Sequence, residues 1–380
     1  MKKRIYMDNA ATTPMDPRVW EAMMPYLEFS YGNPSSVYSF SRENKAAIKN
    51  TRDQASKLIN AKPQEIYFTS GGSESINWAL KGVCFAHEHE GKHVISVKTE
   101  HHAALHALDF LEKRGFEVTY LDVDEFGYVN LNDLEKLIRK DTILVSIMAA
   151  NNETGTLADL QSIGKICDEK QVLFHTDAVQ AIGATELDVR DMHIDLLSAS
   201  AHKFHGPKGV GFLYVKAGIP IENLIHGGNQ ERGRRSGTEN VAGIVGLGKA
   251  LDLLNQDSKE KLEKIRFLRN LLIEGLLEIP DTKLNGPKGE HRLPNNVNIS
   301  FKDIDGESLL LNLDLNSVYA SSGSACTSGA IDESHVLNAM GIESDYIKGS
   351  LRLSLSQFSS EEEVHQVVDI IKTTVKRLRP

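Results

Sequence analysis

Between about residue 15 and residue 255 short apolar runs alternate with amphipathic stretches, and this alternation constrains the fold more than any other feature. Most of the runs are rich in β-branched or aromatic residues and lack a strict alternation of apolar and polar positions, which is typical of strands buried on both faces. Helical stretches lie between many of them, which predicts βαβ units and a mainly parallel sheet. The candidate strands are Ile66–Thr69, Val94–Val97, Val118–Leu121, Ile143–Met148, Val172–His175, Asp195–Ala199 and Val210–Val215.

The pattern changes after Gly248. Lys259–Glu278 predicts one long amphipathic helix, and the polar segment Lys283–Leu293 predicts a loop. Strand-like runs and a last helix follow, and Ser360 with Glu363 forms a capping-box pattern at the start of that helix. Because 380 residues exceed what one hydrophobic core usually holds, we expect two domains of an α/β protein. Residues 15–258 would form the large, mainly parallel-sheet domain, and residues 1–14 with 259–380 would form a smaller α+β domain.

The composition excludes several classes of protein. A hydrophobic fraction of 41% is that of an ordinary globular chain, and a net charge of -9 argues against direct nucleic-acid binding. No apolar run approaches the roughly 18 residues that a membrane span needs, and the N-terminus lacks the apolar segment of a signal peptide. Three scattered cysteines fit neither a disulfide framework nor a metal knuckle. We therefore expect a cytoplasmic protein that binds no membrane.

The strongest chemical signal is the segment Ser198–Gly209, which reads SASAHKFHGPKG. Lys203 follows a predicted buried strand and lies among small residues, where its amine can be desolvated. Such an amine can form a Schiff base with an aldehyde cofactor, and Ser200 and His202 beside it could donate hydrogen bonds to a phosphate. The alternative is a surface lysine in a turn, which any lysine taken alone would favour.

A carboxylate precedes this lysine at the end of another predicted strand, in the segment His175–Gln180. A pyridine ring that acts as an electron sink keeps its nitrogen protonated, and a buried carboxylate can hold that proton. Asp177 is placed for this role, with Gln180 within reach of a phenolic oxygen on the ring. Asp177 could instead be the N-cap of the next helix, and the two roles are compatible.

A glycine-containing turn after Ile66–Thr69 leads into a helix expected to open at about Ser75. Glycine lets the backbone approach an anion, which the N–H groups of a helix start stabilise. Gly72 and Ser73 are therefore candidates to hold a phosphate. The segment matches neither GxGxxG nor GxxxxGK[ST], so a dinucleotide or nucleoside-triphosphate site is not expected. A plain turn between a strand and a helix is the alternative.

Two more loops follow predicted strands and carry polar side chains. His101, in Glu100-His101-His102, could stack on a planar cofactor and shuttle protons; no partner lies at metal-ligand spacing, so no metal site is expected. Asn152 lies in the segment Asn151–Gly155. All these loops would meet at the carboxyl edge of the sheet, where open α/β folds bind their ligands.

The second domain carries a thiol and a cation. Cys326 lies among small residues in Ser321–Gly329, which suits a nucleophile that moves between a pocket and an outside acceptor. A packing cysteine would instead lie among large aliphatic residues. Arg352 alternates with apolar residues in Leu351–Leu355, and its planar fork suits a substrate carboxylate; an ordinary ion pair is the alternative.

Together these segments resemble the cysteine desulfurases of the NifS/IscS type, in the class-V branch of the fold-type I pyridoxal-phosphate (PLP) enzymes. The likeness also runs through Met7–Pro14, Gly32–Ser36 and Arg232–Thr238, and so covers nearly the whole chain. It is carried most specifically by the lysine motif and by the sequence SSGSACTS.

The resemblance implies a PLP-dependent transferase fold (fold type I) and a role for each site residue. Lys203 would be the Schiff-base lysine and the base, and Cys326 would take sulfur from L-cysteine as a persulfide, leaving L-alanine. Asn152 and Arg352 would orient the substrate carboxylate. The remaining residues would bind the cofactor: Asp177 at the ring nitrogen, Gln180 at the phenolic oxygen, His101 stacked on the ring, and Gly72, Ser73, Ser200, His202 and the partner subunit's Thr238 at the phosphate.

The role of Thr238 implies a homodimer, and the persulfide implies a protein sulfur acceptor such as an iron–sulfur scaffold or a tRNA thiolase. The same fold also hosts PLP aminotransferases and selenocysteine lyases, from which only the thiol loop separates this chain. A sulfur carrier without turnover is a further alternative.

Overall fold

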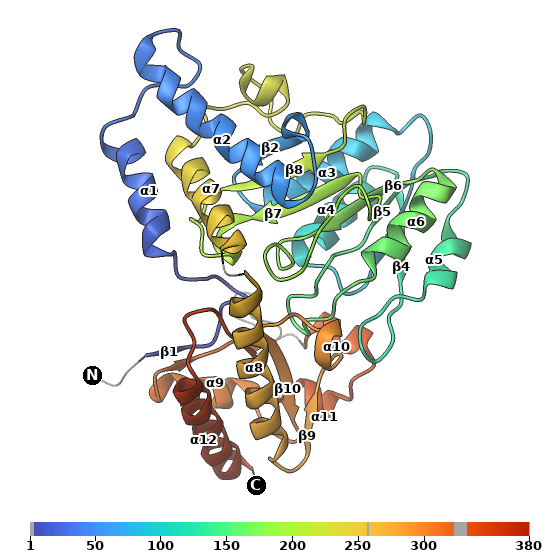
Figure 1. The fold of residues 1–380 in the computed structure, drawn as a ribbon. Coiled ribbons are helices and arrows are strands. Elements are labelled where there is room, and N and C mark those ends of the chain that lie inside the picture. Colours follow the sequence, from blue (N-terminus) through green and yellow to red (C-terminus); the bar gives the residue numbers. More distant parts are fainter. Residues whose placement is uncertain (1–3, 257, 323–332, 380) are drawn as a thin grey trace.

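The computed structural model describes residues 4–256, 258–322 and 333–379. At its centre lies a seven-stranded sheet with the order β2-β8-β7-β6-β5-β3-β4 (Figure 1). Only β8 runs antiparallel to its neighbours, β2 and β7, so the mainly parallel sheet predicted from the sequence is confirmed. The strands are β2 (Ile66–Thr69), β3 (His93–Val97), β4 (Glu117–Leu121), β5 (Thr142–Ser146), β6 (Leu173–Asp177), β7 (Leu196–Ser200) and β8 (Gly211–Val215).

Helices cover both faces of this sheet. Neighbouring strand residues such as Leu196 and Leu197 belong to different apolar clusters because their side chains point to opposite faces. Burial on both faces explains why the strand sequences lack an apolar–polar alternation. One face is covered by α3 (Gly72–Ala86) and α4 (His102–Glu112), and the other by α1 (Pro17–Glu28), α2 (Arg42–Leu58), α6 (Leu160–Lys170) and α7 (Val241–Asn255), with α5 (Leu131–Leu137) beside α6.

A second unit is built on the three-stranded antiparallel sheet β12-β10-β9. Its apolar cluster includes Ile5 and Met7 at the N-terminus, because β1 (Ile5–Tyr6) pairs with β11 (Val318–Tyr319). This packing supports the division into 15–258 and 1–14 plus 259–380, whose exact limits stay a prediction. The other elements are β9 (Thr282–Leu284), β10 (Asn296–Phe301), β12 (Ser350–Ser354), α8 (Ser258–Leu277), α9 (Gly306–Leu315), α10 (His335–Ala339), α11 (Ser344–Ile347) and α12 (Glu361–Leu378).

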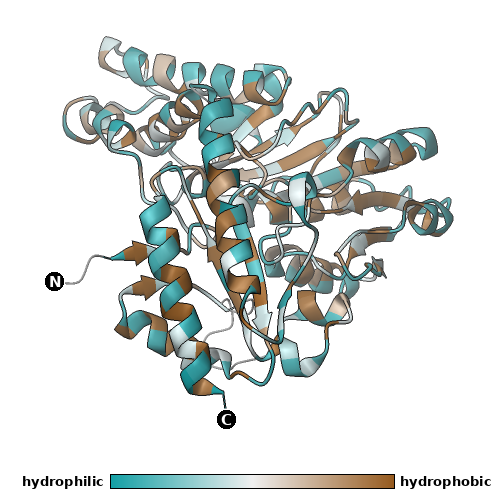
Figure 2. Cartoon of the chain, turned by 60° about the horizontal axis from the view of Figure 1, so that its bottom comes forward, coloured by the Kyte–Doolittle hydropathy of each residue, from teal (hydrophilic) through white to brown (hydrophobic). Residues whose placement is uncertain are grey.

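Short 3-10 turns complete the described structure: η1 (Ser39–Ser41), η2 (Pro63–Glu65), η3 (Ala201–Lys203), η4 (Gln230–Gly233) and η5 (Gly289–His291). The C-terminal helix carries both brown and teal residues in Figure 2, and its apolar side, with Val364 and Ile371, is buried in the core of the second unit. Among the residues that the structure describes, no helix combines the length and apolar character that a bilayer crossing requires.

The predicted starts and ends of individual elements were confirmed in part. The capping box of Ser360 and Glu363 starts α12 as expected. The helix expected from about Ser75 begins at Gly72, so that estimate was wrong by three residues. The loop predicted at Lys283–Leu293 was wrong in part, because β9 overlaps its start and is held by hydrogen bonds to β10, a pairing that the segment's own composition does not reveal.

Candidate active site

The carboxyl ends of the parallel strands surround a cavity of about 400 Å³, here called the central cavity. This volume lies in the range of small-molecule sites. Of the predicted site residues that the structure describes, all but Thr238 line it: the set is Gly72, Ser73, His101, Asn152, Asp177, Gln180, Ser200, His202, Lys203 and Arg352. Loops far apart in the chain therefore converge where the sheet topology places them.

Lys203 ends the 3-10 turn η3, directly after β7. Its Nζ donates hydrogen bonds to the carbonyl oxygens of Ala10, at 2.6 Å, and Ala11, at 2.9 Å. The carbonyl of Ala10 also accepts a hydrogen bond from Gln180 Nε2 at 2.9 Å. The N-terminal segment thus holds the lysine amine and the glutamine amide against the same wall of the cavity.

Asp177 is the last residue of β6 and is only 5% exposed. Its Oδ1 accepts the backbone N–H of Val179 at 2.9 Å. Burial raises the pKa of Asp177 to about 6, although the hydrogen bond from Val179 and the charge of Lys203 act in the opposite direction. A buried carboxylate of this kind is stabilised by a cation placed beside it in the cavity.

His101 is the N-cap of α4, and its Nδ1 accepts the backbone N–H of Ala103 at 3.1 Å. Burial, followed by the nearby charge of Lys203, lowers the pKa of His101 to about 4. The ring is therefore neutral at pH 7, and because Nδ1 accepts a hydrogen bond, the proton is assigned to Nε2. Within the described ranges, no group of three or more His, Cys, Asp or Glu side chains is arranged to hold a metal ion.

The start of α3 forms one end of the central cavity. A Cβ atom on Gly72 would lie 2.7 Å from Cγ2 of Val179, so any larger residue there would force Val179 to shift. A neighbouring hollow of about 420 Å³, here called the outer hollow, shares Gly72, Ser73, Ser200 and His202 with the central cavity. Backbone N–H groups of the helix start and the two serine hydroxyls can donate to an anion at this junction.

Arg352 lies on β12 and brings the second unit into the site. Its Nη1 donates to the carbonyl of Asn152 at 3.2 Å, and its Nη2 to the carboxylate of Asp8 at 3.0 Å. The buried Nε of Arg352 has no hydrogen-bond partner among the described residues. A guanidinium with a spare donor at the cavity wall is suited to bind a carboxylate.

One described site residue, Thr238, does not line the central cavity. Thr238 is exposed, in the segment between η4 and α7. Cys326 lies outside the described residues. Ser321, five residues before it in the sequence, lines the central cavity and pairs with Arg352 through two backbone hydrogen bonds.

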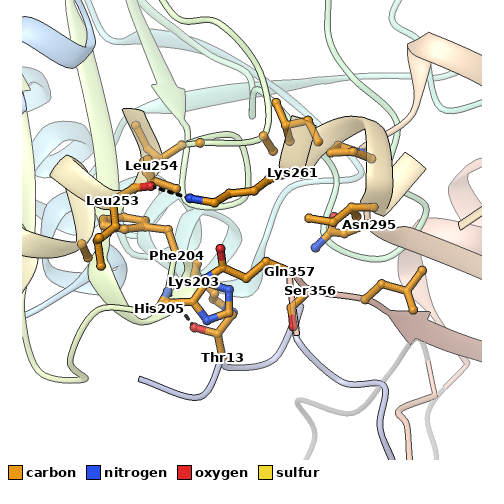
Figure 3. A pocket seen from close by; sticks show the side chains of 18 of the residues that line it. Thr13, Lys203, Phe204, His205, Leu253, Leu254, Lys261, Asn295, Ser356 and Gln357 are labelled. Atoms are coloured by element: carbon orange, nitrogen blue, oxygen red, sulfur yellow. Dashed lines mark hydrogen bonds between the residues drawn. The ribbon is translucent and has the colours of Figure 1, made fainter. Parts of the chain in front are cut away.

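A smaller cavity of about 100 Å³ lies between the sheet domain and α8 (Figure 3). It shares Lys203 and Gln180 with the central cavity. Lys261 reaches across it to the carbonyl of Leu253, at 3.2 Å, and so links α8 to α7. Because this volume is well below that of small-molecule sites, the central cavity is the candidate active site.

Sequence reasoning missed several residues of the site. The carbonyls of Ala10 and Ala11 and the carboxylate of Asp8 belong to the motif Met7–Pro14, which carried a family likeness but no assigned role. Glu100, which does not line the cavity itself, was also missed: its Oε1 accepts the N–H of Met148, a lining residue, at 2.6 Å, and burial, together with the charge of Asp177, raises its pKa well above the ordinary value. Its position next to His101 was the only signal.

Comparisons with known proteins identify relatives over nearly the whole chain. The chain is 54% identical to a protein of Clostridium botulinum named cysteine desulfurase IscS, over all of this chain and 96% of that protein. A solved structure described as a NifS-like protein superposes with a TM-score of 0.93 at 40% identity, over 99% of this chain and all of that one. A structure described as SspA in complex with cysteine has a TM-score of 0.83 at 35% identity, over 94% of this chain and all of that one. Residues 5–367 match the family model described as aminotransferase class-V, and this match, together with the full-length relatives, shows that the chain belongs to this family.

Proposed function

We propose that this protein is a PLP-dependent cysteine desulfurase that converts L-cysteine to L-alanine and keeps the sulfur as a persulfide on Cys326. The observation that carries the proposal is the meeting of Lys203, Asp177, His101 and Arg352 around one cavity. The relatives named cysteine desulfurase and the neighbour described in complex with cysteine support the choice of substrate.

The described residues fit PLP. Asp177 is buried and its pKa is raised to about 6 despite the nearby charge of Lys203, so a protonated ring nitrogen beside it would stabilise the ionised carboxylate. We call Gly72, Ser73, Ser200 and His202 the phosphate cradle, because they surround the helix start where an anion is stabilised. Gln180 would contact the phenolic oxygen, and the neutral His101 would stack on the ring. When bound, PLP acts as an electron sink that stabilises negative charge developing on the substrate.

The residues of this chain would then divide the remaining work. Lys203 Nζ holds the cofactor and afterwards accepts the α-proton of the substrate. Arg352 and Asn152 hold the substrate carboxylate, and the spare Nε of Arg352 matches that task. His101 is neutral at pH 7 with its proton on Nε2, so it can donate that proton and then take one back at the same atom.

Cys326 is the thiol assigned to receive the sulfur. Cys84 and Cys167 are free but buried, and burial raises the pKa of each to about 12, so neither forms a thiolate readily. In the proposed step the thiolate of Cys326 attacks the sulfur of L-cysteine. An S–S bond forms while the C–S bond breaks, and the former β-carbon takes up a proton to give L-alanine. A protein acceptor, an iron–sulfur scaffold or a tRNA thiolase, would then collect the sulfur.

We further propose that the active unit is a homodimer in the cytoplasm. Thr238 is exposed on its own chain and would complete the phosphate site of the partner subunit through the outer hollow. Large apolar side chains are also exposed around α1 and η1, as at an interface between subunits: Trp20, Phe29, Tyr31, Val37 and Tyr38.

The test is to incubate the purified protein with PLP, L-cysteine and a thiol reductant, without any keto acid, and to measure sulfide and alanine together. We expect equal amounts of the two products, and none from Cys326→Ser, while the matched Cys84→Ala protein stays active. A strict requirement for keto acid would indicate an aminotransferase, and turnover of L-selenocysteine alone would indicate a selenocysteine lyase. Either result would overturn the proposal.

A further inference from the structure

An acidic residue lies directly after the phosphate cradle. Glu74 follows Ser73 in the first turn of α3, and its side chain is only 11% exposed. Its Oε2 accepts the backbone N–H of Ser70 at 2.8 Å, which fixes the turn that leads into the helix. The carboxylate therefore serves the geometry of the turn, but its negative charge would repel a phosphate bound at the same helix start.

The guanidinium of Arg235 forms a bidentate ion pair with this carboxylate. Its Nε donates to Oε1 of Glu74 at 2.8 Å, and its Nη2 donates to Oε2 at 3.1 Å. Burial alone would raise the pKa of Glu74, but the hydrogen bonds from Arg235 and Ser70 outweigh it and lower that pKa. Glu74 thus stays ionised at pH 7, and its charge is compensated by Arg235 rather than by protonation.

The segment that carries Arg235 is fastened to the sheet edge beside the cradle. Glu231 pairs with both Nη atoms of Arg52, at 2.7 Å each, and also accepts the backbone N–H of Phe68 on β2 at 3.0 Å. Arg232 donates to the carbonyl of Ile66 at 2.8 Å. These contacts hold Arg235 in place although 161 residues separate it from Glu74 in the sequence.

We propose that Arg235 is a positioning residue for the cofactor phosphate, acting through Glu74. Glu74 fixes the turn before α3, and Arg235 cancels the charge that Glu74 would otherwise place beside the phosphate cradle. The inference rests on the proposed PLP chemistry and adds a specific claim: the pair matters for the phosphate group and not for the ring. An ordinary surface ion pair would contribute little to either.

The experiment compares the apo-proteins of the wild type, Arg235→Met, Glu74→Gln and the double variant. Each is titrated with PLP and with pyridoxal, which lacks the phosphate, and the dissociation constants are read from the visible absorbance at low ionic strength. Glutamine at position 74 keeps an oxygen that can accept the N–H of Ser70. Arg139→Met is the matched control, because Arg139 also forms two-armed ion pairs, with Glu117 and Asp141, at an exposed site outside the central cavity and the outer hollow.

We expect Arg235→Met to weaken PLP binding by about tenfold or more and pyridoxal binding by less than about threefold, because the uncompensated charge acts on the phosphate. Adding Glu74→Gln to Arg235→Met should restore most of the PLP affinity, and Arg139→Met should change nothing. If Arg235→Met does not fold, Arg235→Lys, which keeps the charge but not the fork, should bind PLP between the wild type and the double variant.

Two outcomes would overturn the inference while leaving the proposed function intact. In the first, the double variant binds PLP no better than Arg235→Met, which would make the pair a structural clamp only. In the second, Arg235→Met weakens the binding of PLP and of pyridoxal by the same factor. If the wild-type protein did not bind PLP at all, the proposed function itself would be wrong.

Discussion

The guanidinium of Arg352 and the carboxylate of Asp8 form a hydrogen-bonded ion pair across 3.0 Å at the wall of the central cavity. Their side chains are 5% and 19% exposed, so solvent screens the pair only weakly. Asp8 forms a bridge to Ser354 at the end of the neighbouring strand β12. The N-terminal segment therefore orients the arginine that the proposed function assigns to the substrate carboxylate.

Replacing Arg352 by lysine should impair substrate binding more than cofactor binding. Lysine keeps the charge but loses the planar fork that holds Asp8 and the carbonyl of Asn152 together. We expect KM for L-cysteine to rise by about 10- to 100-fold, the loss of one charge-assisted hydrogen bond or more. Steady-state kinetics with a parallel PLP titration measure both effects, and an unchanged KM would remove Arg352 from substrate binding.

Replacing Lys203 by alanine should abolish both the covalent hold on the cofactor and the base. We expect the visible absorbance of the PLP-loaded protein to change to that of the free aldehyde, and sulfide release to fall by a factor of about 10² to 10⁴ or more. Lys208, which lines the outer hollow but not the central cavity, offers a matched control, because Lys208→Ala should keep the wild-type spectrum. A normal spectrum in Lys203→Ala would refute the assignment.

Most residues of the candidate site could be predicted because the sequence signals for them are local. Lys203, Asp177 and Gly72 each lie at or just after the end of a strand that its own composition reveals, and a parallel sheet must bring such strand ends together. Contacts between distant segments could not be read in this way. The carbonyl of Ala10 meets Lys203 across 193 residues, and β9 forms only by pairing with β10.

The burial or exposure of individual polar residues could not be predicted from the sequence either. Glu100 stands among polar residues in the sequence, in Thr99-Glu100-His101-His102, yet it is 1% exposed, and its Oε1 accepts the backbone N–H of Met148. The exposure of Thr238 follows from the fold of one chain, whereas its proposed role depends on a second chain. A sequence pattern reports which residues follow which strand, and it does not report what packs over them.

Asp177 should give the apo-protein a distinctive pH dependence. Its folded pKa of about 6 exceeds the ordinary value of 3.8, so the folded state prefers the protonated form. Relative to Asp177→Asn, the wild-type apo-protein should therefore gain stability as the pH falls from above 6 to below 4, by a total of about 3 kcal/mol. Urea unfolding of both proteins across this pH range measures the difference between their free energies of unfolding. A difference that does not change with pH would show that burial does not raise the pKa of Asp177.

The three thiols should differ in reactivity. Burial raises the pKa of Cys84 and Cys167 to about 12, so iodoacetamide at pH 7.5 should leave both unmodified in the native protein. We expect modification at Cys326 alone, with loss of sulfide release and normal PLP absorbance. Mass spectrometry of the labelled peptides gives the answer. Labelling of Cys84 before unfolding, or full activity after labelling of Cys326, would contradict the assignment of the sulfur-carrying thiol.

Mixing two impaired variants tests whether Thr238 acts across the subunit interface. In a heterodimer of Lys203→Ala and Thr238→Ala protomers, one site lacks both residues. The other site lies in the Thr238→Ala protomer, which keeps its own Lys203 and receives the partner's Thr238. After the two proteins are unfolded and refolded together, we expect PLP affinity and sulfide release well above those of either parent, approaching about half the wild-type value in the heterodimer. If Thr238 instead served its own chain, no site in the heterodimer would be complete, and the mixture would be no more active than its parents.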